Sequence, residues 1–134
     1  MSSRKILLTA LFAALPLFAV ATASAHGAAA NMKTLDPDSD GTVSLDEAKV
    51  AAGSKFDLRD PDRDGTLDKK EAKGVLSASA FKKADPDNDG TIDKAEYAAA
   101  VSAAFAKADP DNDGTLDAKE LASPAGKAVV KLIQ

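Results

Sequence analysis

Two segments of the chain carry apolar residues at helical spacing, with polar residues and small residues filling the positions between them. The apolar positions are Leu45, Ala48, Ala52 and Phe56 in the first segment, and Tyr97, Val101, Ala104, Phe105 and Ala108 in the second. A recurrence every three to four residues is typical of an amphipathic helix. We therefore predict one uninterrupted helix in each segment, roughly 18–20 Å long at a rise of 1.5 Å per residue.

The segment between them, EAKGVLSASAFKKA at 71–84, has no such continuous pattern. Gly74 and Ser77 interrupt it, and either Ser77 or Ser79 is a suitable N-cap for a new helix. We expect a break here that folds the chain back on itself. Near the C-terminus, Ser123 followed by Pro124 predicts the start of a last helix. Its apolar face is formed by Val129, Val130 and Ile133.

Four acidic blocks separate these segments and align with one another without a gap. They are DPDSDGTVSLDE at 36–47, DPDRDGTLDKKE at 60–71, DPDNDGTIDKAE at 85–96 and DPDNDGTLDAKE at 109–120. Each has Asp at positions 1, 3 and 5, Gly at 6, Thr at 7, an aliphatic residue at 8 and Glu at 12. This is the pattern of the EF-hand cation loop, and four copies in phase make it a specific signal.

The spacing explains the chemistry, because alternate side chains at positions 1, 3 and 5 converge on one point as the loop curls. The glycine permits the sharp turn, the threonine carbonyl supplies another oxygen, and the glutamate closes the shell with both its oxygens. Aspartate at position 9 adds a carboxylate, directly or through a water, in the last three loops. The predicted metal ligands are Asp36, Asp38, Asp40, Thr42, Glu47, Asp60, Asp62, Asp64, Thr66, Asp68, Glu71, Asp85, Asp87, Asp89, Thr91, Asp93, Glu96, Asp109, Asp111, Asp113, Thr115, Asp117 and Glu120. All are hard oxygen ligands, which suit calcium or a similar hard cation and disfavour zinc or copper.

The first loop differs from the others at position 9, where Ser44 replaces aspartate. Serine carries no charge, and Asp46 beside Glu47 is poorly placed to replace it. We predict that the first of the four sites binds its cation most weakly.

The loops begin only 24 or 25 residues apart, so one connecting segment must leave one loop and enter the next. The sequence predicts an all-α fold, a compact helical bundle with four closely spaced EF-hand loops in which adjacent hands share helices. If the middle connector breaks, loops two and three lie side by side and loops one and four meet at the far ends of the long helices. Position-8 residues then form short strand contacts, Val43 with Leu116 and Leu67 with Ile92.

The N-terminus has the three parts of a secretory signal peptide. Arg4 and Lys5 precede an apolar run over 6–20, and Ala23-Ser24-Ala25 forms a small-residue cleavage site. We expect a signal peptide over 1–25, a flexible tail over 26–34 that starts at His26, and a metal-binding domain over 35–134. The processed chain is then exported and has no membrane span.

Composition narrows the classes of function. Loss of the two basic residues in 1–25 takes the net charge from −4 to −6, and a nucleic-acid-binding protein requires the opposite sign. The chain has no cysteine, which excludes disulfides and thiolate metal sites. Leu, Ile, Val and Phe make up only 19 of the 109 residues after the signal peptide, with Phe56, Phe81 and Phe105 expected in the core and Tyr97 in the core or at its rim. Such a core is too small for us to expect stable folding without a cation.

Proline at position 2 of every loop, the short intervals, the signal peptide and the ending ELASPAGKAVVKLIQ resemble the lanmodulin family of exported EF-hand proteins. The resemblance covers the chain from about Leu35 onward. It implies a periplasmic protein that prefers lanthanide(III) ions to calcium, binds up to four of them and becomes a compact bundle as it does so. It also implies a role beside lanthanide-dependent alcohol dehydrogenases or an uptake system. The departure is Ser44, which weakens the resemblance for the first site.

The residues alone leave other functions open. A calcium buffer or sensor that presents an apolar face to a protein partner uses the same loops, although only Met32 among the methionines survives processing. A docking module of the dockerin kind also repeats calcium loops at short intervals, but four loops with Glu at every position 12 disfavour it. We expect no enzymatic activity, because no nucleophile–base pair is visible and nearly all the acids serve as ligands.

Overall fold

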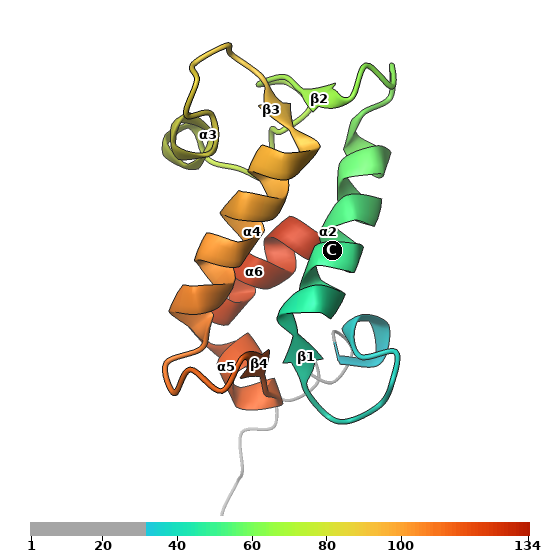
Figure 1. Ribbon diagram of the computed structural model, residues 1–134, viewed down its shortest axis with the longest axis vertical. Helices are drawn as coiled ribbons and strands as arrows, with labels where there is room; N and C mark the ends of the chain where they lie inside the picture. Colours follow the sequence, from blue (N-terminus) through green and yellow to red (C-terminus); the bar gives the residue numbers. More distant parts are fainter. Residues whose placement is uncertain (1–31) are drawn as a thin grey trace, which may run out of the picture.

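A computed structural model describes residues 32–134, and two long antiparallel helices form its frame (Figure 1). Helix α2 spans Leu45–Arg59 and helix α4 spans Lys94–Ala108. These are the two uninterrupted helices that the apolar spacing predicts. At 15 residues each they are about 22 Å long, slightly longer than expected, because each begins inside the preceding loop at position 10. Position 9 is the N-cap of each helix.

The middle connector breaks as predicted. A single turn follows the second loop and ends at Gly74, whose φ of +91° a helix cannot accommodate. Helix α3 (Ala78–Ala84) then begins after Ser77, whose Oγ accepts the N–H of Ala80 at 3.2 Å. Ser77, not Ser79, is therefore the N-cap, and Ser79 hydrogen-bonds to it with an Oγ–Oγ distance of 3.2 Å.

Two short antiparallel sheets join the four loops in pairs. Strand β1 (Val43–Ser44) pairs with β4 (Thr115–Leu116), and β2 (Thr66–Leu67) pairs with β3 (Ile92–Asp93). Val43 lies opposite Leu116 and Leu67 lies opposite Ile92, which confirms the predicted position-8 contacts. Loops one and four therefore meet at one end of the long helices, and loops two and three meet at the other (Figure 1).

The C-terminal segment closes the bundle. Helix α5 (Ala118–Ala122) leaves the fourth loop, and helix α6 (Pro124–Ile133) crosses behind α2 and α4 (Figure 1). Ser123 caps α6, as predicted, by accepting the N–H of Gly126 at 2.9 Å. Gly126 lies so close to the end of α5 that a Cβ atom there would overlap the carbonyl oxygen of Glu120. A glycine is therefore required at the α5–α6 junction.

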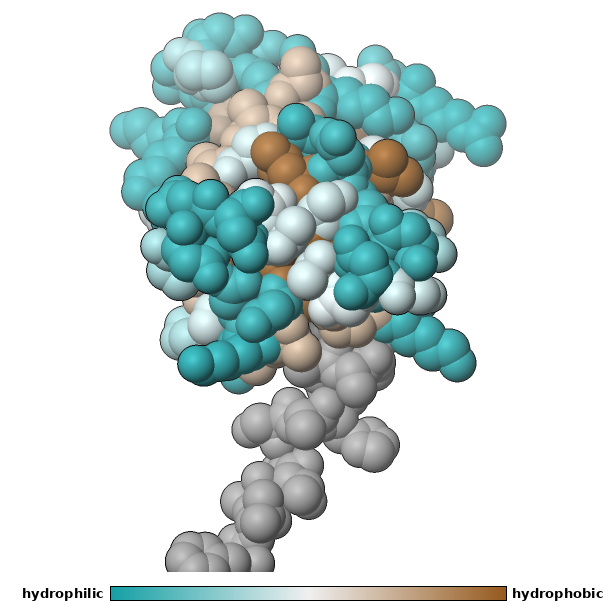
Figure 2. Space-filling view, turned by 60° about the horizontal axis from the view of Figure 1, so that its bottom comes forward, coloured by the Kyte–Doolittle hydropathy of each residue, from teal (hydrophilic) through white to brown (hydrophobic). Residues whose placement is uncertain are grey.

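The core contains twenty buried apolar residues in the described part, and five of them are alanines. The buried apolar residues of the described part are Leu35, Val43, Ala48, Ala52, Phe56, Leu67, Ala72, Val75, Phe81, Ala84, Ile92, Tyr97, Val101, Phe105, Ala108, Leu116, Leu121, Val129, Leu132 and Ile133. The three predicted phenylalanine anchors are among them, and Tyr97 lies in the core rather than at its rim. In the view of Figure 2, hydrophilic residues cover most of the surface and hydrophobic ones form only small, separate areas.

At the N-terminal side, residues 32–35 are helical and lead into the first loop. Residues 32–34 of the segment in which we expected a flexible tail therefore have helical backbone. The N–H of Asp36 donates to the carbonyl oxygen of Met32 at 2.9 Å, and Leu35 is buried in the core. The predicted signal peptide over 1–25 and His26 lie outside the described residues. No helix in the described range combines the length and apolar character that a membrane crossing needs.

The candidate metal centres

Each loop starts where a helix ends, and its first aspartate fastens the loop to that end. The N–H groups of Asp60, Asp85 and Asp109 each donate to a phenylalanine carbonyl one turn earlier, at 3.0 Å. These three aspartates are buried, with 6–7% of each residue exposed. A buried carboxylate needs hydrogen-bond donors or a cation to offset its desolvation.

Backbone amides of positions 5 and 6 supply donors to this first aspartate. In the first loop, the N–H of Asp40 donates to Asp36 Oδ1 at 3.1 Å and the N–H of Gly41 donates to Asp36 Oδ2 at 2.9 Å. The same two bonds recur in the other loops at 3.0–3.2 Å. The loop backbone is thereby wound around the first carboxylate.

Two residues with positive φ make this winding possible. The glycines at position 6 have φ of 86–92°, as the turn requires. Position 4 is also left-handed, with φ of 57–60° at Ser39, Arg63, Asn88 and Asn112. Sequence reasoning missed position 4, although Asn at this position in loops three and four is a residue that tolerates the left-handed region.

The aspartate at position 5 holds the threonine at position 7. In the third loop Asp89 Oδ1 accepts both the N–H of Thr91 at 2.8 Å and its hydroxyl at 2.7 Å. All four loops share this pair of bonds. Because the Thr91 and Thr115 hydroxyls and amides stabilise the ionised form, the pKa values of Asp89 and Asp113 are lowered. The position-5 carboxylates of these two loops are therefore anionic at neutral pH.

The glutamate at position 12 is fixed by a capping box with position 9. In loops two to four, the Oδ1 atoms of Asp68, Asp93 and Asp117 accept the glutamate N–H at 2.7–2.9 Å. The glutamate Oε2 in turn accepts the aspartate N–H at 2.9 Å. Position 9, which we predicted as a ligand, is therefore also the helix cap in loops three and four and caps the single turn after loop two, and its Oδ1 atom is engaged in that role.

The first loop keeps the cap with a different group. Ser44 Oγ accepts the N–H of Glu47 at 3.3 Å, while the N–H and hydroxyl of Ser44 donate to Glu47 Oε2 at 2.8 and 2.9 Å. The other oxygen, Glu47 Oε1, is buried and has no hydrogen-bond partner in the described part of the protein. An orphaned buried carboxylate oxygen at position 12 fits a cation ligand at this point.

Ligand atoms of three carboxylates lie within 4.8 Å of one another in each loop. The groups are Asp36, Asp38 and Asp40; Asp60, Asp62 and Glu71; Asp85, Asp87 and Glu96; and Asp109, Asp111 and Glu120. Twelve of the predicted carboxylates thus converge, three per loop. The structure does not place Asp64, Asp89 and Asp113, nor the three position-9 aspartates, in these groups, and in the first loop it leaves out Glu47.

Carboxylates whose oxygens lie within 4.8 Å of one another repel, which raises the free energy of the loop when no cation is bound. In the first loop Asp38 shares a hydrogen bond with Asp36, and this bond together with repulsion from Asp40 and Glu47 raises the pKa of Asp38. For Asp36, desolvation acts to raise the pKa, but hydrogen bonds from Gly41, Asp38 and Asp40 outweigh it and lower the pKa. One carboxyl of the pair thus retains its proton more readily, and a bound cation would replace that proton.

These donor sets are hard, anionic and oxygen-only, which fits a hard cation. The EF-hand family model matches residues 76–102 and 101–123, which contain the third and fourth loops. A search of curated proteins gave no match. Proteins with EF-hands are generally metal-binding or sensor proteins rather than enzymes. The matched segments and the four acidic loop groups together support an EF-hand metal-binding protein.

Proposed function

We propose that this protein binds lanthanide(III) ions in the periplasm, folds around them, and buffers or carries them without catalysing a reaction. The observation that supports this most directly is the convergence of three carboxylates in each of four loops, whose ligand atoms lie within 4.8 Å. Such clusters are costly unless a cation offsets their repulsion. The predicted export signal and the resemblance to lanmodulins favour the periplasm and delivery to, or from, a lanthanide-dependent alcohol dehydrogenase or an uptake system.

Charge favours a trivalent ion in these loops. At a fixed distance, the Coulomb attraction of the same carboxylates for a trivalent cation is one and a half times their attraction for calcium. Each loop carries five acidic side chains, so calcium leaves a formal local charge of −3 and a trivalent ion leaves −2. Hydration opposes this gain, since the trivalent ion also loses more hydration free energy than calcium when it leaves water. The preference for a trivalent ion over calcium therefore depends on a loop that closes only when the attraction to the ion is strong enough.

The prolines at position 2 support such a loop. All four are exposed, so none of them belongs to the buried core. Proline fixes its own φ near −65° and restricts the preceding residue, which here is the first ligand. The prolines therefore act on the conformational freedom of the open loop, which closes with less entropy loss around a suitable ion.

Coupling of metal binding to folding is supported by the composition of the core. Five of the twenty buried apolar residues are alanines, which contribute little transfer free energy. Every loop is tied to a helix end through position 1 and starts the next segment through position 12. Binding free energy at the loops is then available as folding free energy for the helices between them.

The decisive experiment follows helix content by circular dichroism during titration with lanthanum(III) and, separately, with calcium. Our proposal expects folding at a far lower free concentration of lanthanum. Equal midpoints would instead favour the calcium buffer or sensor, which the same loops permit. If the cation-free protein were already as helical as the loaded protein, metal-coupled folding would be contradicted, but the preference for lanthanum would not.

Terbium(III) luminescence provides a site-resolved companion measurement. The chain has one tyrosine and no tryptophan, and Tyr97 directly follows Glu96 of the third loop. Excitation of Tyr97 should sensitise terbium bound in that loop more than in the first and fourth loops at the far end of α4. Loss of luminescence on removing the loop-three carboxylates, but not the loop-one carboxylates, is the expected result.

A further inference from the structure

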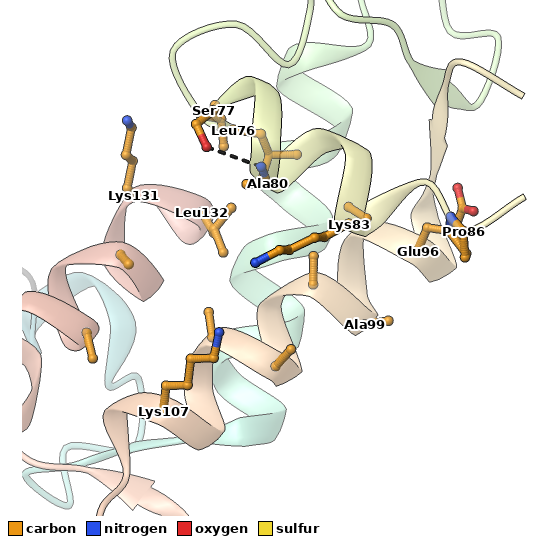
Figure 3. A pocket seen from close by; sticks show the side chains of 17 residues that line it. Leu76, Ser77, Ala80, Lys83, Pro86, Glu96, Ala99, Lys107, Lys131 and Leu132 are labelled. Carbon is orange, nitrogen blue, oxygen red and sulfur yellow. Dashed lines mark hydrogen bonds between the residues drawn. The ribbon is translucent and has the colours of Figure 1, made fainter. Parts of the chain in front are cut away.

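A hollow of about 520 Å³ lies between helices α3, α4 and α6, and Glu96 is the one member of the carboxylate clusters that lines it. Its floor on α4 is built from Ala99, Ala100, Ala103 and Ala104, and Leu132 of α6 extends into it (Figure 3). We name it the alanine groove. Its volume lies in the range of about 300–1,000 Å³ that is typical of small-molecule sites in proteins.

The rim of the alanine groove is cationic, although the chain as a whole is acidic. Lys83 of α3, Lys107 of α4 and Lys131 of α6 line it, one from each helix. Figure 3 shows the side chains of Lys83 and Lys107 reaching over the hollow, while Lys131 stands at the α6 edge. The one acidic side chain on the rim is Glu96, which belongs to the third metal loop.

These three ammonium groups have no partner in the described part of the chain. The one ion pair there joins Lys94 to Asp57, on the α2 side of α4. Within the described residues, none of the three lysine side chains makes a hydrogen bond or lies over an aromatic ring, whereas Lys69 and Lys94 lie over rings. The rim is therefore an unused site of positive charge beside an apolar floor, and an anion with an apolar body complements both features.

We propose that the alanine groove binds a small amphiphilic monoanion, an apolar body of drug-like size that carries one carboxylate or sulfonate. The body lies on the α4 alanines against Leu132, and the anionic group lies between Lys83 and Lys107. This site goes beyond the proposed function, since it needs neither a lanthanide nor a particular cation in the loops.

The floor favours a small molecule over a protein surface or a second copy. Protein interfaces centre on large aromatic or aliphatic anchors, and the exposed large hydrophobic residues of the described part, Val50 and Leu58, are on α2. A second copy related by a two-fold axis would bring two sets of unpaired lysines together. The cationic rim and the alanine floor thus both favour a small amphiphilic anion over a protein partner or a second copy.

The test uses the purified calcium-loaded protein with 8-anilinonaphthalene-1-sulfonate as the probe. Fluorescence gives its affinity, and amide shifts of labelled protein locate it. Competition with 4-phenylbutyrate and its neutral analogue 4-phenylbutanol then separates charge from apolar contact. We expect shifts at Ala99, Ala103 and the end of α6, and displacement by the acid at far lower concentration than by the alcohol.

Two matched triple variants test the rim. Lys83→Gln with Lys107→Gln and Lys131→Gln should weaken probe binding on the order of tenfold, as three exposed charge contacts warrant. The control, Lys49→Gln with Lys82→Gln and Lys127→Gln, has the same net charge and changes no groove-lining residue. It should bind within about twofold of the parent, since none of its three side chains lines the groove and exposed charges are partly screened.

A filling variant completes the design. Ala103 is exposed on the groove floor, so Ala103→Leu should retain the fold, checked by circular dichroism, while it blocks the probe. Equal losses in the two lysine triples, shifts confined to other surfaces, or equal competition by acid and alcohol would each overturn the proposal. The proposal would also be overturned if the protein bound anionic vesicles but not the free probe, or if sedimentation showed that the probe makes the protein dimerise.

Discussion

The hydroxyl of Tyr97 donates a hydrogen bond of 2.6 Å to the carbonyl oxygen of Leu132 and so joins α4 to α6 inside the core. Tyr97 is 1% exposed, and its ring meets that of Phe56 edge to face at a centroid distance of 5.7 Å. One side chain thus connects the helix that leaves loop three with α2 and with the C-terminal helix.

The first prediction follows from this burial. Desolvation raises the pKa of Tyr97 to about 12, against a smaller opposing effect of Arg59. Since the folded pKa exceeds the ordinary value near 10, the contribution of Tyr97 to stability is complete below pH 10. It is lost as the pH rises through 12. Tyrosinate absorbance at 295 nm reports this residue alone. The calcium-loaded protein should titrate well above the same protein in denaturant, and coincident curves would refute the buried phenol.

The second prediction concerns the α5–α6 junction. Gly126→Ala places a Cβ against the Glu120 carbonyl, which should destabilise the loaded protein by about 1–3 kcal/mol. It should also weaken the fourth site, because Glu120 is its position-12 residue. Gly53→Ala is the matched control. Its Cβ would meet Lys94 Cε at an ordinary 3.9 Å, so the helix propensity of alanine should stabilise α2 by about 1 kcal/mol. Thermal melting with excess calcium measures both, and similar shifts for the two variants would contradict the close approach.

The third prediction concerns the charge missing from the first loop. Ser44→Asp keeps an N-cap group for α2 and adds a carboxylate at position 9, so the first site should bind calcium about fivefold more tightly. The amide of Gly41 reports this site in a nuclear magnetic resonance titration. Ser54→Asp, which adds the same charge on an exposed part of α2, should leave that midpoint almost unchanged. A Gly41 midpoint that matches those of Gly65, Gly90 and Gly114 in the parent protein would show that the first site is not the weakest.

The fourth prediction concerns the loop prolines. Replacing Pro37, Pro61, Pro86 and Pro110 together with alanine should raise the lanthanum concentration needed for folding. Each proline removes about 0.4–1 kcal/mol of conformational freedom from the open chain. Pro124→Ala, outside the loops at the start of α6, serves as the control. Circular dichroism titrations give the midpoints. Unchanged midpoints for both lanthanum and calcium would show that the prolines do not contribute to metal-coupled folding.

Local sequence predicts much of this architecture because its signals are short-range. The Asp, Gly, Thr and Glu spacing predicts where each loop winds, and apolar spacing predicts α2 and α4. Gly74 with Ser77 predicts the break before α3, and Ser123 with Pro124 predicts α6. The pairings of Val43 with Leu116 and of Leu67 with Ile92 follow once the middle connector turns back, because loop position 8 then has one available partner at each end.

The remaining features depend on contacts between distant segments, and no short pattern encodes them. Four hard-cation loops and the helices that they share can be read from the sequence alone, since ligand and cap positions lie within twelve residues of one another. Long-range packing, in contrast, sets the hydrogen bond from Tyr97 to Leu132, the need for glycine at Gly126, and the meeting of three lysines from three helices around one groove. Those relationships require α6 to pack across α2 and α4, and that packing is set by how the whole buried surface fits together.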